Sequence, residues 1–366
     1  MIAVFAYAFP HRKSRDVLME LALSGVRHVC VIAAPCEKLP AMDRAVYIPK
    51  TLQIPEPQDT RTVAKYLGFD YVEMPHSDIE ALSGVIAEKG LRIGIIAGAR
   101  ILKRSIIEVF PEGIVNFHPG KIPETSGLDA FFYTIESGVD AGVTTHFIDP
   151  RVDAGHLLYF DALEIGPDDS AEVVQENSYK LQLVALRRFL ADKEAGRLEP
   201  IPVDRPFKNK PMTPDKKWEM LRRFPAWRAE RHLAQMTAKL HAASAAGQVE
   251  RVATLLDSYP GLLETRTPEG WTPLILAAFH QNIKTAELLL TRGADANATG
   301  RKGTTVIMYA KTALLEAETP DTSMLDLLIA HGADLTRCDM FGLNILHYAQ
   351  KSSALTRYFI QKGVAG

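Results

Sequence analysis

The last third of the chain repeats a pattern at intervals of about 33 residues, and this periodicity limits the fold more than any other feature of the sequence. The segment Gly-Trp-Thr-Pro-Leu-Ile-Leu-Ala-Ala that begins at Gly270 recurs in altered form 33 residues later at Gly303, and again at Gly342. A period of this length is typical of stacked repeats, in which each copy buries its apolar face against its neighbours. The sequence therefore predicts one continuous stack.

Each repeat also contains a second helical segment. Thr285–Asp295 aligns with Leu325–Asp334, and Gly293 and Gly332 stand where these helices should end, a position that favours the left-handed backbone of glycine. These signatures resemble the ankyrin repeat. The resemblance implies an all-α ankyrin-repeat domain over 233–366. An early partial copy, Leu240–Ala243 with Val249–Leu256, brings the expected number to about four repeats, and an excess of about six residues around Glu316–Thr322 indicates a loop insertion.

The first half of the chain alternates short β-rich apolar runs with segments whose apolar residues recur at helical spacing. This alternation is typical of a parallel sheet covered by helices and joined by right-handed crossovers. The sequence therefore predicts an α/β domain over 1–200 with a doubly wound, mostly parallel sheet. The expected strands are Ile2–Ala6, His28–Ala33, Tyr71–Met74, Ile93–Ala97, Ile114–Phe117 and Thr144–Ile148, and the expected helices are Ser14–Leu23, Thr60–Tyr66, Asp78–Glu88 and Tyr179–Arg197.

A proline-rich polar segment, Glu199–Pro206, follows the α/β region. It cannot form a regular interior element, because proline lacks the amide hydrogen that helices and sheets use. This segment predicts a domain boundary near residue 200. Connecting helices are expected over 201–232, before the repeats begin.

The charge balance narrows the choice of partners. The chain has 42 lysines and arginines against 44 aspartates and glutamates, so it lacks the broad positive charge that nucleic acid or an anionic membrane would attract. No segment reaches the roughly 20 apolar residues needed to span a bilayer. Three cysteines are too few for a disulfide framework. These features predict a cytoplasmic protein.

One segment combines residues that can carry chemistry. Asn116-Phe117-His118-Pro119-Gly120 follows an expected strand, at the end where doubly wound sheets bind their ligands. Asn116 and His118 are two residues apart on extended backbone, so their side chains should share one face while Phe117 points to the other. About 35 residues later, Val152-Asp153-Ala154-Gly155 puts a carboxylate on a turn after another strand.

These two segments resemble the active-site signature of the folate-dependent formyltransferases. The resemblance implies that Asn116, His118 and Asp153 are catalytic and that 10-formyltetrahydrofolate is the co-substrate. The residue types suit the reaction, because attack of an amine on a formyl carbon needs a donor for the developing oxyanion and an acceptor for the proton. Asn116 can donate, His118 can donate or accept, and Asp153 can orient the imidazole or an ordered water. The histidines match no compact zinc motif, so no metal site is expected; they are His118, His146 and His156.

Two further segments are expected to contact ligands. In the family, the strand end at Ala97–Leu102 forms a slot for the folate pteridine, although a tight strand-to-helix turn is the alternative. The basic run His11, Arg12 and Lys13 stands at an expected helix N-terminus, which favours a phosphate. This run departs from the glycine-rich phosphate loop of the purine enzyme, and a solvated basic turn is the alternative. The resemblance assigns cofactor binding to Ala97, Gly98, Arg100, Ile101, Leu102, Pro119 and Gly120.

The acceptor is inferred from one more resemblance. The run from His118 to Phe132 is similar to the nucleotide-sugar N-formyltransferases of bacterial O-antigen (lipopolysaccharide) synthesis, some of which carry ankyrin repeats. This similarity implies a dTDP-linked amino-dideoxyhexose as the substrate. The sequence does not choose between a 3-amino and a 4-amino sugar, and another small primary amine stays open. The expected substrate contacts besides the basic run are Lys121, Glu124, Thr125, Ser126 and Gly127.

Other readings remain open. Transfer RNA is disfavoured as acceptor, because tRNA-formylating members carry a basic C-terminal domain and these repeats are nearly neutral. The rivals are a hydrolase that uses water as acceptor and a catalytically inactive ankyrin adaptor, against which the intact trio argues. The repeats are expected to bind a protein partner, with an auxiliary nucleotide ligand near Arg301 and Lys302 as the alternative. The Leu181–Arg205 region is compatible with a homodimer.

Overall fold

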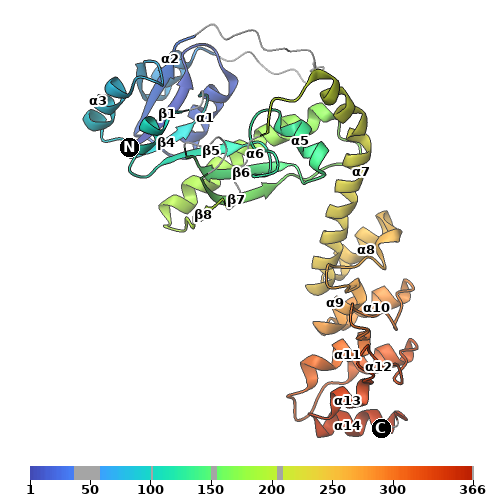
Figure 1. The fold of residues 1–366 in the computed structure, drawn as a ribbon. Coiled ribbons are helices and arrows are strands. Elements are labelled where there is room, and N and C mark those ends of the chain that lie inside the picture. Colours follow the sequence, from blue (N-terminus) through green and yellow to red (C-terminus); the bar gives the residue numbers. More distant parts are fainter. Residues whose placement is uncertain (37–57, 100–101, 150–154, 204–208, 365–366) are drawn as a thin grey trace. The chain divides into compact units, whose positions relative to one another are not determined.

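Figure 1 shows the chain as a computed structural model that describes residues 1–36, 58–99, 102–149, 155–203 and 209–364. The described residues form two compact units, Met1–His232 and Leu233–Gly366. The first unit contains an α/β sheet and the second contains helical repeats, so both fold classes predicted from the sequence are confirmed.

The first unit is built on an eight-stranded sheet with the order β3-β2-β1-β4-β5-β6-β7-β8. The strands from β3 to β5 run parallel, whereas β6, β7 and β8 continue the sheet antiparallel. The strand order reverses between β1 and β4, and in open sheets such a switch point opens a crevice at the carboxyl ends of the strands. The strands are β1 (Ile2–Tyr7), β2 (Val29–Ala34), β3 (Asp70–Glu73), β4 (Ile93–Ile96), β5 (Ile114–His118), β6 (Gly142–Phe147), β7 (His156–Ala162) and β8 (Ile201–Pro202).

The second half of the sheet differs from the expectation. The expected strand Thr144–Ile148 falls in β6 except for Ile148, but β6 runs antiparallel to β5 and is followed by β7, which the sequence does not predict. The connection between Phe147 and His156 is shorter than the dozen or so residues that a parallel crossover requires. The short connection therefore makes β6 and β7 an antiparallel pair.

Helices cover both faces of the sheet (Figure 1). On one face, Leu18 of α1 and Phe189 of α6 are buried with Phe117 of β5. On the other face, Ile106 of α4 is buried with Ile114 of β5. Successive residues of β5 therefore enter two separate cores, as the alternation of side chains along a strand requires. These helices are α1 (Arg12–Leu23), α2 (Thr60–Leu67), α3 (Ile79–Lys89), α4 (Arg104–Glu108) and α6 (Ala171–Glu194).

The segment 201–232, expected to be a connector, contributes to the first unit. β8 pairs with β7. The first half of α7 (Pro214–Ala245) buries Phe224 and Trp227 in one cluster with Phe132 of α5 (Ala130–Ser137). The first half of α7 joins the first unit because its apolar side chains need a core. β8 can pair with β7 because a proline is tolerated in an edge strand.

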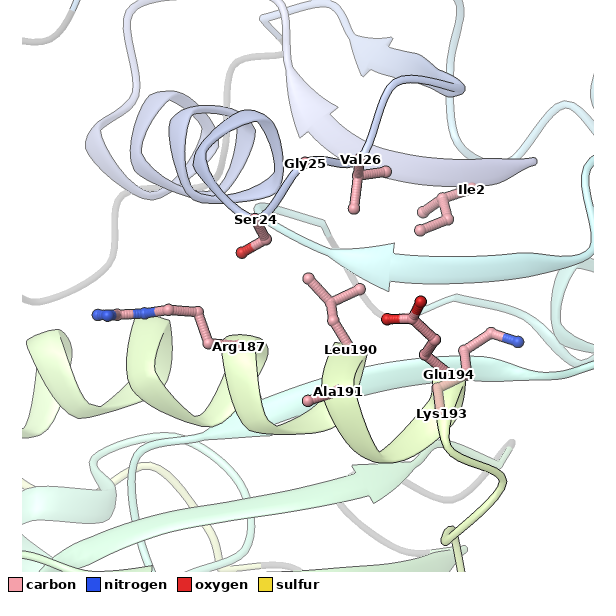
Figure 2. A pocket seen from close by; sticks show the side chains of 9 residues that line it. All are labelled: Ile2, Ser24, Gly25, Val26, Arg187, Leu190, Ala191, Lys193 and Glu194. Carbon is pink, nitrogen blue, oxygen red and sulfur yellow. The ribbon is translucent and has the colours of Figure 1, made fainter.

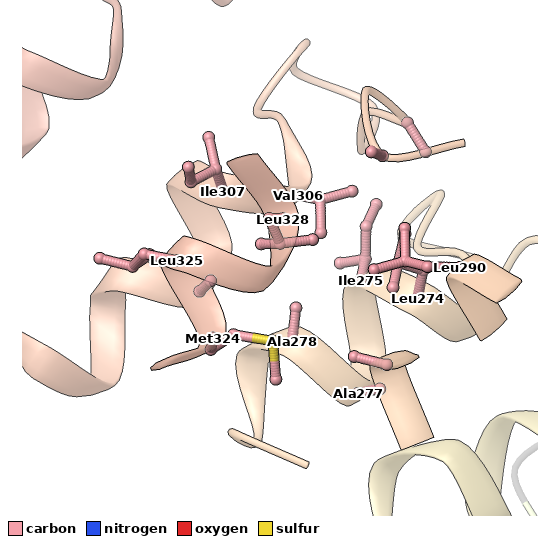
Figure 3. Close-up of a cluster of buried hydrophobic side chains, with 14 of the residues drawn as sticks. Leu274, Ile275, Ala277, Ala278, Leu290, Val306, Ile307, Met324, Leu325 and Leu328 are labelled. Atoms are coloured by element: carbon pink, nitrogen blue, oxygen red, sulfur yellow. The ribbon is translucent and has the colours of Figure 1, made fainter. Parts of the chain in front are cut away.

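The second unit stacks short helices around one continuous core. Figure 3 shows Ile275 of α9, Val306 of α11 and Leu328 of α12 gathered in this cluster. Gly293 and Gly332 have φ angles of +91° and +87°, which confirms the predicted left-handed helix ends. The helices are α8 (Val249–Ser258), α9 (Pro273–Phe279), α10 (Ile283–Thr291), α11 (Val306–Ala310), α12 (Ser323–Ala330), α13 (Ile345–Ala349) and α14 (Ser353–Gln361).

Candidate active site

The carboxyl end of β5 carries the two described members of the predicted catalytic trio. Ile114, two residues before Asn116, is buried on the face covered by α4, whereas Phe117 packs on the opposite face with its ring centroid 6.2 Å from that of Phe189. Strand alternation therefore puts Asn116 and His118 on the same face, with Phe117 on the other, as the spacing predicts.

The amide of Asn116 is held by a neighbouring strand. β6 pairs with β5 so that His146 stands opposite Asn116, and Nδ2 of Asn116 lies 3.3 Å from Nε2 of His146. His146 is completely buried. From the sequence, His146 is considered only as a metal ligand, and its contact with Asn116 is not predicted. The signal that could have found it is a histidine in a strand that is otherwise apolar and β-branched.

The ring of His118 is fixed by the loop that follows it. Its Nε2 lies 3.0 Å from the carbonyl oxygen of Thr125, and His118 is only 4 % exposed. Because a carbonyl can only accept, Nε2 carries the hydrogen of the neutral ring and Nδ1 is the basic nitrogen. The loop provides both the orientation and the tautomer of the candidate base.

The same loop is braced from β6. The hydroxyl of Thr144 donates to the carbonyl of Gly120 at 2.6 Å and accepts from the amide of Ile122 at 3.2 Å. Gly120 has no room for a side chain, because a Cβ there would lie 2.1 Å from Oγ1 of Thr125. This close approach requires glycine and lets the loop fold back over the end of β5.

The predicted substrate contacts of this loop are mostly engaged within the protein. Thr125 and Ser126 are completely buried. The amide side chain of Asn209 donates to the carbonyl of Glu124 at 2.9 Å, and an isolated β-bridge joins Asn209 to Gly127. The ammonium of Lys121 lies 5.8 Å from the ring centre of Phe160 on β7.

Part of the predicted cofactor slot is described. Ala97 is fully buried, and its amide donates to the carbonyl of Phe5 at 2.9 Å. A Cβ on Gly98 would lie 2.8 Å from the ring of Tyr7, so the strand end is closely packed there. Leu102 is buried on the same face as Ile114. Three predicted site residues lie outside the described residues, namely Arg100, Ile101 and Asp153.

The wall beside this slot suits a flat apolar ring. Ile96 and Ala99 are partly buried beside Leu102, on the face of the sheet to which Asn116 and His118 belong. An apolar surface next to polar groups at strand ends is the usual composition of a cofactor site. The described residues therefore fit a folate pteridine in their chemistry.

The basic run after β1 is tied to α6. His11 caps α1, with its Nδ1 accepting from the amide of Ser14, and burial, assisted by Lys13, lowers the pKa of His11. The guanidinium of Arg12 makes two hydrogen bonds to Glu176, of 2.7 and 2.6 Å, and these bonds raise the pKa of Arg12. The charge of Arg12 is therefore matched inside the protein, and its role in this arrangement is to hold α6 against the loop.

One cavity of the first unit, of about 500 Å³, lies between the start of β1, the end of α1 and the end of α6 (Figure 2). It contains no predicted site residue and lies at the amino end of β1, away from the strand ends that bear Asn116 and His118. A second cavity, of about 320 Å³, borders Pro119 and lies between α5 and α6. Of these two cavities, the smaller adjoins the candidate site.

The described residues contain no group of three or more histidine, cysteine, aspartate or glutamate side chains arranged to hold a metal ion. Within the same residues, no helix combines the length and apolarity needed to cross a membrane.

Comparison with known proteins gives a family match in each unit. The family model described as formyl transferase matches residues 63–189, and the model described as ankyrin repeats (3 copies) matches residues 240–316. The chain is 30 % identical over 154 residues to methionyl-tRNA formyltransferase of Heliobacterium modesticaldum, covering 42 % of this chain and 48 % of that protein. It is 29 % identical over 91 residues to phosphoribosylglycinamide formyltransferase of Bacillus subtilis, covering 25 % and 47 %. The chain thus spans about half the length of these curated relatives.

Solved structures give matches of lower identity. Phosphoribosylglycinamide formyltransferase from Anaplasma phagocytophilum aligns with a TM-score of 0.42 at 19 % identity, over 54 % of this chain and 89 % of that one. A sugar N-formyltransferase from a Shewanella species aligns with a TM-score of 0.41 at 15 % identity, over 57 % and 76 %. The family models thus place a match to formyl transferase in the first unit and a match to ankyrin repeats in the second.

Proposed function

We propose that this protein transfers a formyl group from 10-formyltetrahydrofolate to the amine of a dTDP-linked amino-dideoxyhexose. The observation that carries the proposal is the shared face of Asn116 and His118 at the carboxyl end of β5, where the loop holds the imidazole in one tautomer. The match of residues 63–189 to the formyl transferase family supports the same reaction.

The two side chains can provide the hydrogen-bond donor and the proton acceptor that formyl transfer needs. Asn116 has two amide hydrogens, of which one is directed at His146 and the other can donate to the formyl oxygen as it gains negative charge. His118 can take the proton that the attacking amine loses, on the ring nitrogen that is not bound to Thr125. Asp153 is proposed as the third catalytic residue, to orient His118 or a water.

The folate co-substrate, when bound, would supply the formyl carbon. Its pteridine is proposed to lie along Leu102 and the rest of the strand end from Ala97, including Gly98, Arg100 and Ile101, with Pro119 and Gly120 closing the slot. The apolar surface beside Leu102 supports this assignment.

The loop that follows His118 is proposed to contact the sugar acceptor. The proposed sugar contacts are Lys121 and the loop from Glu124 to Gly127, and the proposed phosphate contacts are His11 and Lys13. Arg12, which is bound to Glu176, would act by fixing the loop rather than by neutralising a phosphate. The structure of a sugar N-formyltransferase among the similar proteins is compatible with this class of acceptor.

The cellular setting is also a proposal. A cytoplasmic protein would meet both the folate and the nucleotide sugar, and the ankyrin unit is proposed to bind a protein partner. A homodimer through the Leu181–Arg205 region is a further proposal, which sedimentation analysis of the purified chain would test.

The test of the reaction is a direct assay. Purified protein is incubated with 10-formyltetrahydrofolate and a panel of dTDP-3-amino and dTDP-4-amino sugars, methionyl-tRNA and small amines, while release of tetrahydrofolate is followed. We expect turnover with an amino sugar and its loss in His118→Ala. Release without any amine would identify a hydrolase, turnover with a different amine would replace the sugar, and absence of folate binding would support the inactive adaptor.

A further inference from the structure

The cavity that borders Pro119 has a buried amide on its wall. Gln182 of α6 lines this cavity of about 320 Å³ and is only 7 % exposed. Among the described residues its side chain has no hydrogen-bond partner. The amide of Gln182 is not among the side-chain atoms that are fully buried without a partner, so it is accessible through the cavity. It is therefore available to hydrogen-bond a ligand that enters the cavity.

Ser178 extends this polar strip. It lies one turn before Gln182 on the same face of α6, and its hydroxyl also has no partner among the described residues. The other polar side chains of the lining make hydrogen bonds within the protein. The hydroxyl of Tyr179 donates to Asp16 at 2.6 Å, the hydroxyl of Thr134 donates to the carbonyl of Ala130 at 2.9 Å, and Nε2 of Gln175 donates to the carbonyl of Ala171 at 3.2 Å. Gln182 and Ser178 are thus the polar side chains of the lining for which the described residues provide no hydrogen bond.

The charge of the cavity is neutral. Asp129 lies at its edge, but its carboxylate accepts from the amide of Met212 at 3.0 Å and pairs with Lys217 at 2.7 Å. Among the described residues that line the cavity, none is lysine or arginine. A phosphate would find no cation here, so the part of a ligand that enters is uncharged.

The remaining walls are apolar and partly aromatic. Phe131, Phe132, Ala141 and Val174 line the cavity. A sugar ring carries several hydroxyl groups, and two free polar side chains cannot satisfy them all. A flat heterocycle needs fewer hydrogen bonds, since its faces pack on apolar and aromatic groups and one edge presents a donor beside an acceptor. An amide such as that of Gln182 offers the complementary pair.

We propose that this cavity binds the nucleobase of a nucleoside diphosphate, with the amide of Gln182 hydrogen-bonded to the polar edge of the base and Ser178 as a second contact. Pro119 joins the cavity to His118 along the chain, so a nucleotide held here is anchored beside the candidate site. The inference deepens the proposed function and rests on it for the statement that this nucleotide is part of the formyl acceptor.

Binding can be measured without any transfer. Thymidine diphosphate and inorganic pyrophosphate are titrated calorimetrically into the full chain in the absence of folate, for wild type, Gln182→Leu, Ser178→Ala and Gln361→Leu. Gln361 is an exposed glutamine of α14, so it receives the same replacement outside the cavity. We expect Gln182→Leu to weaken thymidine diphosphate binding about tenfold or more, Ser178→Ala to weaken it less, and Gln361→Leu to leave it unchanged.

The stability of the variants separates a binding role from a structural one. Removal of an amide for which the described residues provide no hydrogen bond should leave the thermal midpoint of Gln182→Leu unchanged or raise it, whereas a structural role would lower it. Equal affinity of wild type and Gln182→Leu would overturn the inference, as would pyrophosphate binding as tight as that of thymidine diphosphate or no binding of either. Should Gln182→Leu fail to fold, Gln182→Met and Ser178→Ala carry the same comparison.

The two proposals can fail separately. Formyl transfer to a dTDP-amino sugar with the same KM in wild type and Gln182→Leu would leave the reaction standing and overturn the nucleobase cavity. Nucleotide binding that depends on Gln182, without formyl transfer to any nucleotide-linked amine, would support the cavity and overturn the proposed function.

Discussion

The side chain of Asn116 is anchored at one amide hydrogen by His146, 3.3 Å away, which leaves the second hydrogen oriented for a substrate oxygen. Replacement by leucine keeps the shape of the side chain and removes the donor. We expect Asn116→Leu to lower kcat about 100- to 1000-fold, because a lost oxyanion donor typically costs that much. The KM for the folate should change little.

Steady-state kinetics with the preferred amine checks this expectation. The hypothesis fails if Asn116→Leu raises KM alone, because that pattern would mean that Asn116 binds the ground state and the transition state equally.

Cys30 shows what burial does to a potential nucleophile. It is completely buried in β2, and this burial raises the pKa of its thiol to about 11. Cys36 and Cys338 are exposed. With a thiol reagent at pH 8, we expect two cysteines of the native protein to react quickly and the third only after unfolding. Cys36→Ser should remove one fast equivalent, whereas rapid reaction of three thiols would contradict the burial of Cys30.

At the scale of elements, β6 supports the loop that positions His118. The hydroxyl of Thr144 donates a hydrogen bond to the carbonyl of Gly120 and accepts one from the amide of Ile122, and both hydrogen bonds are buried. Thr144→Val keeps the shape but leaves these groups unpaired, so we expect it to lower the free energy of unfolding of the first unit by about 1–3 kcal/mol. It should also reduce kcat, because the loop holds the imidazole.

Thr134→Val is the matched control, since the hydroxyl of Thr134 bonds only to Ala130 within its own helix. Urea titration measures both variants. An equal loss of unfolding free energy in Thr144→Val and Thr134→Val would show that the hydrogen bonds of Thr144 stabilise the unit no more than a hydrogen bond within one helix.

At the scale of the whole molecule, each unit has its own buried core, so a core mutation in the repeats should act on the repeats alone. Leu289 of α10 is completely buried, whereas Ile360 of α14 is 56 % exposed. Leu289→Ala should destabilise the second unit by about 2–5 kcal/mol through the cavity it leaves, and Ile360→Ala should cost much less.

Scanning calorimetry of the full chain, with formyl transfer as a second readout, distinguishes the two units. A loss of catalytic activity in Leu289→Ala at a temperature where the first unit remains folded would contradict independent cores.

The stability of the repeats should also depend on pH. Burial lowers the pKa of His241 below its ordinary value of 6.5, and its Nε2 lies 3.2 Å from the carbonyl of Thr265. The unfolded chain therefore binds more protons than the folded one in the range just below pH 6.5, so the free energy of unfolding should fall as the pH decreases through that range.

Thermal unfolding between pH 5 and 7.5 measures this slope. His241→Gln should flatten it, and the same replacement at the exposed His331 should leave it as in wild type. A slope that His241→Gln does not alter would assign the dependence to other groups.

Local patterns in the sequence were sufficient for much of this molecule. The repeat interval specified the second unit, because each copy has an apolar face that only another copy can cover. The alternation of strands and helices predicted the parallel half of the sheet. The two-residue spacing of Asn116 and His118 placed both on one face, since that outcome depends only on the geometry of a strand.

Contacts between distant segments were decided by the tertiary structure. The antiparallel pairing of β6 sets His146 against Asn116, Arg12 meets Glu176 across 164 residues, and α5 encloses Gln182 against α6. None of these follows from periodicity, because the period of a strand or helix determines which face a residue occupies but not which segment covers that face. That choice is made by the packing of the complete sheet and its helices, and it is this packing that turns separate polar residues into a site.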